Sequence, residues 1–251
     1  MNLHLKEKKI LLVGLGRGIG RAIAKAYADE KAQLFILSRD ENYLKKTIDS
    51  INGTNRHNYL KTELMKSKEP TRISEFLIKQ YKYFDIVIHN IGGPFGIRDS
   101  LAEIDDWEKV WRLNVGIAIE MNRILIKPML TRQWGRIIHI SSISSRILRG
   151  APQYCCAKAY LNAYIKTMGR SFAKDGIIIS GILPGAVEFK DSYWAKTKKL
   201  NQEKYYGFLK EHQAIGRMGK PEEIASFAVF LGSEKASFAA GTLIPIDGGN
   251  M

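Results

Sequence analysis

The chain has 251 residues, 45% hydrophobic and 25% charged, a balance typical of one globular domain with a sizeable core. No apolar run approaches the ~20 residues needed to cross a bilayer. The first residues, "MNLHLKEKK", carry charge where an export signal needs an apolar stretch. We therefore expect a cytoplasmic protein with no membrane contact.

The basic charge and the two cysteines each suggest a site that the rest of the sequence does not support. The formal net charge is +14, but the lysines are scattered and no nucleic-acid-binding motif accompanies them. We therefore expect an anionic small ligand rather than nucleic acid. Cys155 and Cys156 are the only cysteines, and an adjacent pair makes neither a disulfide framework nor a zinc site. We predict that both are packing residues and that the chain holds no metal.

Short apolar runs rich in β-branched residues alternate with longer amphipathic segments along the chain. The runs predict strands at 8–13, 33–37, 85–89, 136–140, 177–183 and 242–246, with a weaker one near 57–62. The longer segments predict helices at 18–31, 41–51, 69–82, 105–131, 153–174 and 221–232. This alternation predicts an α/β fold over residues 1–251, a doubly wound, Rossmann-type parallel sheet of about seven strands with helices on both faces. The Lys- and Tyr-rich segment 188–216 is expected to be a flexible helical excursion beside the substrate.

A glycine-rich turn joins the first predicted strand to the first helix, in "VGLGRGIGRAIA" (13–24). Glycines at this place allow a tight turn and let main-chain amides approach a pyrophosphate at the helix N-terminus. A plain strand-to-helix turn needs one glycine, whereas this one has four. The turn therefore predicts a dinucleotide site. The predicted contacts here are Gly14, Gly16, Arg17, Gly18, Ile19 and Gly20.

The end of the second strand indicates which dinucleotide is bound. An acid about 20 residues past the glycines would bind the ribose 2′-hydroxyl of NAD. Here Ser38 and Arg39 come first and Asp40 follows. Arg39, with Arg17 in the glycine turn, can bind a 2′-phosphate, so we predict NADP(H) in preference to NAD(H).

The segment "YCCAK" (154–158) places Tyr154 and Lys158 four residues apart, on one face of the predicted helix. A phenol pKa near 10 needs lowering by ~3 units for work near neutrality, worth about 4 kcal/mol. A cation about 4 Å away at an effective dielectric near 20 supplies on the order of 4 kcal/mol. Lys158, with a positively charged nicotinamide, could therefore make Tyr154 a proton donor and acceptor. Tyr-x-x-x-Lys pairs also occur by chance, but "ISSISS" (140–145) adds serines at a strand end that faces the ligand cleft.

In these motifs and their order, the chain resembles the short-chain dehydrogenase/reductase family over nearly its whole length. Beyond the motifs already described, the matching segments are "HNIGG" (89–93), "LNVG" (113–116), "LPG" (183–185), "GKPEEIA" (219–225) and "IDGG" (246–249). The resemblance implies a catalytic tetrad of Asn114, Ser142, Tyr154 and Lys158. In it the tyrosine donates the proton, the serine orients the carbonyl, the lysine binds the nicotinamide ribose, and the asparagine holds a water.

The resemblance also implies cofactor contacts outside the glycine turn. They are Ser38, Arg39, Asn90, Gly92, Tyr154, Lys158, Pro184, Gly185 and Val187. Three departures from the family pattern put details in question. Val13 replaces a common threonine, Phe189 stands where a threonine touches the nicotinamide end, and "YLKTELM" (59–65) lacks a clear match for the acid that contacts adenine. Ser141 remains the alternative to Ser142, which we favour because Ser141 continues the other face of the strand.

Three functions compete at this point. The first is an NADP(H)-dependent reductase of a carbonyl compound or acyl thioester, acting also as the reverse alcohol dehydrogenase. The second is specifically a 3-oxoacyl-acyl-carrier-protein reductase; the positions where those enzymes present arginine to the carrier are Gln133 and Asp175 here, with Arg132 and Lys174 adjacent. The third is a cofactor-binding protein without catalysis. Aromatic and cationic residues in the candidate substrate loops, Arg98 and Trp194 among them, suggest an anionic or acyl substrate. Relatives usually form homotetramers through the helices predicted at 105–131 and 153–174, so we expect a tetramer.

Overall fold

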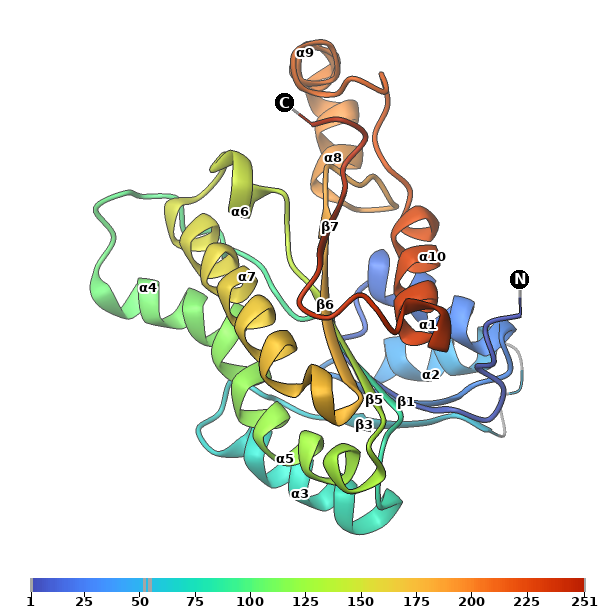
Figure 1. Ribbon diagram of the computed structural model, residues 1–251. Coiled ribbons are helices and arrows are strands. Elements are labelled where there is room, and N and C mark those ends of the chain that lie inside the picture. Colours follow the sequence, from blue (N-terminus) through green and yellow to red (C-terminus); the bar gives the residue numbers. More distant parts are fainter. Residues whose placement is uncertain (1, 52, 54–55, 251) are drawn as a thin grey trace.

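A computed structural model describes residues 2–51, 53 and 56–250 and shows a seven-stranded parallel sheet in the order β3-β2-β1-β4-β5-β6-β7 (Figure 1). The predicted fold class is confirmed. The strands are β1 (Lys9–Val13), β2 (Gln33–Ser38), β3 (Asn58–Lys61), β4 (Ile86–His89), β5 (Gly135–Ile140), β6 (Ile177–Pro184) and β7 (Leu243–Ile246).

Helices cover both faces of this sheet because its central strands are apolar on both sides. Leu12 of β1 packs into one core, under α1 (Ile19–Asp29), α2 (Glu41–Ser50) and α10 (Pro221–Gly232). Leu11, its neighbour in the same strand, packs into the other core. That second core lies under α3 (Glu69–Tyr81), α4 (Ile104–Trp111), α5 (Ile117–Arg132) and α7 (Pro152–Phe172). Figure 1 shows the two groups of helices on opposite sides of the sheet.

The predicted helix at 105–131 consists of two helices that run on through a wide turn. The turn is the π-helix η2 (Arg112–Gly116), which joins α4 to α5. A π-turn in a helix often marks a functional position, and here it contains Asn114. The sequence also gave no sign of the short helix α6 (Ser144–Ile147), which follows β5.

Residues 188–216, expected to form a helical excursion, contain α8 (Tyr193–Leu200) and α9 (Gln202–His212). Each begins at a side-chain cap: the Ser192 hydroxyl accepts from the Ala195 amide, and the Asn201 side chain accepts from the Lys204 amide. Figure 1 shows both helices above the carboxyl ends of β6 and β7.

Strand order reverses between β1 and β4, so the loops after these strands separate at the carboxyl edge of the sheet. Open α/β sheets bind ligands at such a point. Two short 3₁₀ helices, η3 (Ala173–Asp175) and η4 (Glu234–Ala236), do not lie at this edge. Within the described part of the chain, no helix is both long and apolar enough to span a bilayer.

Candidate active site

The glycine-rich turn after β1 is held by Asn90, the residue that directly follows the neighbouring strand β4. Gly14 has a φ of +97°, and a Cβ there would lie 3.1 Å from the Asn90 carbonyl. The Asn90 side chain donates a hydrogen bond to the Gly14 carbonyl over 2.7 Å, and a Cβ on Gly20 would come within 2.6 Å of that same amide. Gly16, by contrast, has nothing within 4 Å of a would-be Cβ, so its main chain is open to a ligand. The turn thus fits a dinucleotide phosphate.

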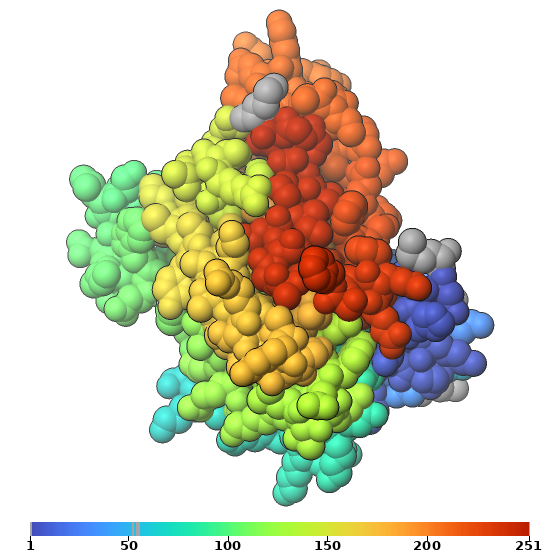
Figure 2. Space-filling view, in the orientation of Figure 1, coloured from blue at the N-terminus to red at the C-terminus, as the bar shows by residue number. Residues whose placement is uncertain are grey.

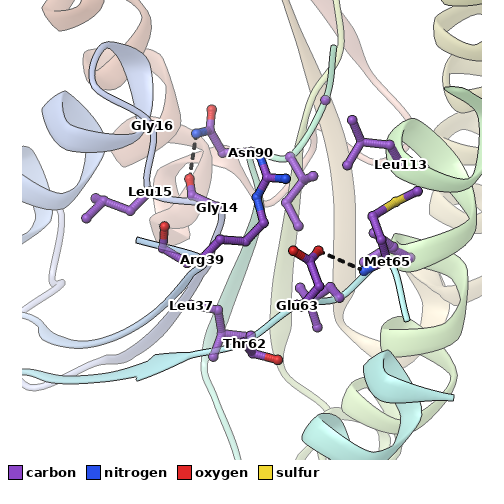
Figure 3. Close-up of a pocket in the computed structure, with 15 residues that line it drawn as sticks. Gly14, Leu15, Gly16, Leu37, Arg39, Thr62, Glu63, Met65, Asn90 and Leu113 are labelled. Carbon is purple, nitrogen blue, oxygen red and sulfur yellow. Dashed lines mark hydrogen bonds between the residues drawn. The ribbon is translucent and has the colours of Figure 1, made fainter. Parts of the chain in front are cut away.

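A pocket adjoins this turn on the side of β2 and β3 (Figure 3). Of the predicted cofactor contacts it brings together Gly14, Gly16, Ser38, Arg39, Asn90 and Gly92. Asp40 does not line it, because its carboxylate caps α2 and accepts a hydrogen bond from the Tyr43 amide over 3.0 Å. Asp40 instead lines the adjoining depression at the edge of the cleft, together with Arg39 and Lys61.

The sequence did not single out several residues of this pocket. They are Leu15, Leu37, Thr62, Glu63, Leu64, Met65, Ile91, Leu113 and Ile117. Figure 3 shows the Arg39 side chain extending into the pocket between Asn90 and Glu63, whose carboxylate accepts from the Met65 amide over 3.4 Å. Glu63 and Leu64 follow directly after β3, and β3 was only weakly signalled. A firm prediction of that strand would have pointed to them.

Arg17 and Gly18 do not line this pocket. The Arg17 guanidinium lies 3.5 Å from the Asp191 carboxylate, and both side chains are more than half exposed. A Cβ on Gly18 would lie 2.4 Å from the Phe189 ring, so that ring packs directly on the glycine turn. The excursion after β6 therefore closes over the start of α1, and the aromatic residue that departs from the family pattern makes this contact.

A second pocket continues the cleft toward β5 and β6, and the two pockets share Asn90, Ile91 and Gly92. It contains the predicted residues Ile19, Asn90, Gly92, Ser142, Tyr154, Lys158, Pro184, Gly185 and Val187. Pro94, Ile140, Ser141, Ala186, Phe189, Ser192, Tyr193 and Trp194 also line it. The cleft therefore runs from Arg39 at one end to the Tyr154 side chain at the other.

Ser142, not Ser141, is directed at Tyr154. A hydrogen bond with Ser142 favours the ionised form of the Tyr154 hydroxyl, and the Ser142 oxygen also accepts from the Ser144 amide over 3.1 Å. The Ser141 hydroxyl instead donates to the Asn162 side chain over 2.7 Å. The two serines point in opposite directions because successive side chains alternate between the two faces of an extended chain, as they do directly after β5.

Lys158 is 2% exposed, and its ammonium group donates to the Ile140 carbonyl over 2.9 Å. Burial lowers the pKa of Lys158 to about 7. Its nitrogen lies 5.7 Å from the centre of the Tyr154 ring.

The expected lowering of the Tyr154 pKa by Lys158 is therefore not seen in the protein alone. Burial is the largest influence on the Tyr154 pKa and raises it, with the Ser142 hydrogen bond acting in the opposite direction. Lys158 itself loses charge on burial, so it cannot act as the full cation that a stabilisation of about 4 kcal/mol requires.

Asn114 lies behind the cleft rather than in it. Its amide nitrogen donates to the carbonyls of Gly93 (2.9 Å) and Val110 (2.8 Å), and its oxygen accepts from the Gly93 amide over 3.1 Å.

The two cysteines differ from each other: Cys155 is buried and fits the packing role, whereas Cys156 is exposed. Neither lines the pocket that contains Tyr154.

Comparison with known proteins agrees with this geometry. The sequence model of a family described as enoyl-(acyl carrier protein) reductase matches residues 14–250. A 3-oxoacyl-[acyl-carrier-protein] reductase of Aquifex aeolicus is 29% identical over 256 residues, covering 99% of each chain. The corresponding reductase of Salmonella typhimurium is 30% identical and covers 97% of each.

Solved structures give the same result. L-Sorbose reductase from Gluconobacter frateurii, complexed with NADPH and L-sorbose, superposes with a TM-score of 0.88 at 29% identity, covering 100% of this chain and 98% of its own. A 3-oxoacyl (acyl-carrier-protein) reductase of Agrobacterium tumefaciens with NADP bound gives 0.91 at 25% identity, covering 99% and 96%. The chain belongs to the short-chain dehydrogenase/reductase family and is an NADP(H)-dependent oxidoreductase, rather than a cofactor-binding protein without catalysis.

Proposed function

We propose that the enzyme reduces a carbonyl group to a secondary alcohol, or runs the reverse reaction, with Tyr154 as the proton donor and acceptor. The observation that carries this proposal is the meeting of Tyr154, Ser142 and the buried Lys158 in one pocket at the carboxyl edge of the sheet. NADPH supplies the hydride when it is bound in the adjoining cleft. The side chains described here bind the substrate oxygen and move its proton.

Each member of the tetrad has a distinct task in this proposal. Ser142, hydrogen-bonded with Tyr154, orients the carbonyl oxygen toward the phenol. Burial keeps the pKa of Tyr154 high, so the phenol holds its proton at neutral pH and can give it to an alkoxide. Lys158, with a pKa of about 7, can exchange a proton at working pH and bind the nicotinamide ribose. Asn114 fixes the Gly93 loop, and we propose that it holds the relay water.

The cofactor-binding set is proposed as the residues that line the cleft together with the glycine turn. Arg39 is the group proposed to bind the 2′-phosphate. Arg39 and Lys61 line one depression at the edge of the cleft, which Asp40, Glu41 and Glu63 line as well. Arg17, Gly18 and Gly20 are proposed to support the turn from outside the pocket, since Arg17 is paired with Asp191 and Gly18 is covered by Phe189.

The test follows NADPH oxidation at 340 nm with purified protein over a panel of keto-sugars, quinones and acyl thioesters. Replacing Tyr154 by Phe removes one hydroxyl and should lower kcat by about 100- to 10,000-fold while NADPH binding is retained. Turnover that survives this substitution would refute the assignment of Tyr154.

A 3-oxoacyl-acyl-carrier-protein reductase is the second candidate, favoured by the similarity to the reductases of Aquifex aeolicus and Salmonella typhimurium. One observation speaks against the carrier contact considered above. Arg132, one of the two adjacent cations considered above with Lys174, is bound to Asp85 over 2.7 Å and stacks on the Tyr83 ring at 3.7 Å. Reduction of acetoacetyl-acyl carrier protein at least ~10-fold faster than of the free thioester would support a carrier-specific enzyme.

We also propose a homotetramer. Trp111 and Tyr160 pack edge to face at 6.0 Å on the outer side of α4 and α7, and both rings stay partly exposed. The C-terminal segment with β7 lies on the surface beside α7 (Figure 2), and Phe238 next to it is fully exposed. A monomer in light scattering at micromolar concentration would contradict this.

We place the enzyme in the cytoplasm. The sequence contains no disulfide framework, which is usual for proteins of that compartment.

A further inference from the structure

Tyr193 connects the candidate active site with the surface of the excursion. It is the first residue of α8, it lines the same pocket as Tyr154 and Ser142, and it is half exposed. Its neighbour Trp194 lines the pocket too, and the two rings meet edge to face at 5.1 Å. The mouth of the pocket is therefore aromatic, with a phenol hydroxyl at its rim.

Two cations from distant parts of the chain converge on the Tyr193 ring. The Arg98 guanidinium, in the loop after β4, lies 6.0 Å from the ring centre, and the Lys204 ammonium, on α9, lies 5.7 Å from it. Lys204 also hydrogen-bonds with the hydroxyl. That bond, and then the charges of Lys204 and Arg98, lower the Tyr193 pKa. The rim is thus positively charged as well as aromatic.

Lys204 has carboxylates in its surroundings, since Glu203 and Glu211 line the same surface depression. In the part of the chain that the structure describes, Arg98 and Lys204 form no ion pair with an aspartate or glutamate. Asp99, which is adjacent in sequence to Arg98, uses its carboxylate to accept from the Leu101 amide over 2.9 Å. Glu188, on the excursion, accepts from the Tyr205 hydroxyl and pairs with Lys198. Both charges make the electrostatic potential around the Tyr193 side chain more positive, which favours an anion there.

We propose that Arg98, Lys204 and the Tyr193 hydroxyl bind an anionic oxygen group of the substrate, so that the enzyme acts on carbonyl compounds that carry a carboxylate or a phosphate. The carbonyl lies at Tyr154 and Ser142, and the anionic end lies at the rim of the same pocket. This inference rests on the proposed function, because it assigns the substrate class of that site. A neutral ketone of the same size lacks the second contact.

A purely structural cation–π role would use the same geometry, and conservative variants separate the two. Lys204→Arg and Arg98→Lys keep the charge, whereas Lys204→Gln and Arg98→Gln remove it. An exposed ion pair contributes 0.2–1 kcal/mol, so each charge removed should lower kcat/KM for an anionic substrate by up to about fivefold. The charge-keeping variants should retain most of that activity.

The experiment compares each oxo acid with its own methyl ester, using 3-oxobutanoate, 5-oxohexanoate and 7-oxooctanoate to span different distances between carbonyl and anion. A second comparison tests phosphate in place of carboxylate, with acetoacetyl-coenzyme A against the neutral acetoacetyl-N-acetylcysteamine. The matched controls are Lys210→Gln, exposed on the same helix as Lys204, and Arg123→Gln, exposed on α5. We expect the best anionic substrate to exceed its neutral partner at least ~10-fold in kcat/KM, an advantage that both control variants retain and that 0.5 M salt reduces.

Equal turnover of acid and ester, abolished by Tyr154→Phe, would overturn this inference and leave the proposed function standing. If no carbonyl in the panel is turned over, the proposed function fails and a binding measurement decides the anion site. Quenching of the protein's tryptophan fluorescence then compares hexanoate with hexanol on the NADPH-loaded protein. Preference for hexanoate that Lys204→Gln removes would support the site, and equal binding of the two would refute it.

Discussion

The Asn114 side chain binds both main-chain polar groups of Gly93, accepting from its amide at 3.1 Å and donating to its carbonyl at 2.9 Å. A Cβ on Gly92, the preceding residue, would lie 2.7 Å from the Asn114 oxygen and 2.9 Å from the Lys158 nitrogen. The π-turn between α4 and α5 places Asn114 for this contact. The loop after β4 and Lys158 are therefore positioned together.

Replacing Asn114 by Ala should reduce both stability and turnover. The variant leaves the Gly93 amide without its partner, which costs about 1–3 kcal/mol in the free energy of unfolding. Displacement of the loop that faces Lys158 should also lower kcat by about tenfold or more. Urea unfolding and steady-state kinetics measure the two effects. Asn122→Ala is the control, because Asn122 is fully buried but bonds to His89 and Tyr164 outside the cleft. A similar loss of kcat in that variant would contradict the positioning role.

Substitutions of Ser141 and Ser142, which directly follow β5, should have different effects on kcat and on stability. Ser142→Ala removes the hydroxyl that bonds with Tyr154, and a lost oxyanion donor costs about 100- to 1000-fold in kcat. Ser141→Ala removes a buried bond to Asn162 and should cost about 1 kcal/mol in stability with little change in kcat. Measuring kcat and the urea midpoint of both variants tests the pair. The reverse pattern would assign catalysis to Ser141.

Arg39 should decide the choice between NADPH and NADH. Because a hydrogen bond to a charged group contributes about 1.5–3 kcal/mol, Arg39→Gln should weaken NADPH binding by about ten- to a hundredfold. NADH binding should hardly change, since that cofactor lacks the 2′-phosphate. Titration of protein fluorescence with each cofactor measures this. Arg17→Gln is the comparison: its guanidinium is paired with Asp191, and we expect a smaller loss of NADPH affinity. An equal loss in both variants would place Arg17 at the phosphate as well.

Most of the fold was predictable because its signals are local. The glycine turn and the Tyr154–Lys158 spacing each lie within a few residues, so pattern and geometry coincide. β3 was weakly signalled because it is a four-residue edge strand with polar ends, and Glu63 was missed with it. Such a strand lacks the continuous apolar run that marks a strand buried on both faces.

The contacts of the excursion could not be predicted in the same way. Phe189 meets Gly18, and Lys204 approaches Tyr193 beside Arg98, through folding of a segment whose own pattern is only helical. Nothing in local spacing indicates which earlier loop such a segment will contact. The charge state of Lys158 was misjudged for a related reason: spacing gives proximity to Tyr154, but only the packed structure gives the loss of water that lowers the lysine pKa.

Two buried histidines lie side by side in the sheet. The His89 and His139 rings stack at 4.8 Å and 14° on neighbouring strands β4 and β5. The His89 Nε2 group donates to the Asn122 oxygen over 2.8 Å, whereas neither ring nitrogen of His139 has a hydrogen-bond partner among the described residues. Burial lowers the pKa of His89 to about 4 and holds the pKa of His139 well below its usual range.

These histidines should make the protein less stable as the pH falls below about 6.5, the ordinary histidine pKa. Between that pH and about 4 for His89, the unfolded chain takes up a proton that the folded protein excludes. Each histidine should therefore lower the free energy of unfolding by up to about 1.4 kcal/mol per pH unit in that window. Urea unfolding at pH 7.5, 6.0 and 5.0 measures the slope, which His89→Asn or His139→Asn should reduce. His4→Asn, at an exposed position, is the control and should leave it unchanged. A slope that both buried variants leave intact would show that other groups govern acid unfolding.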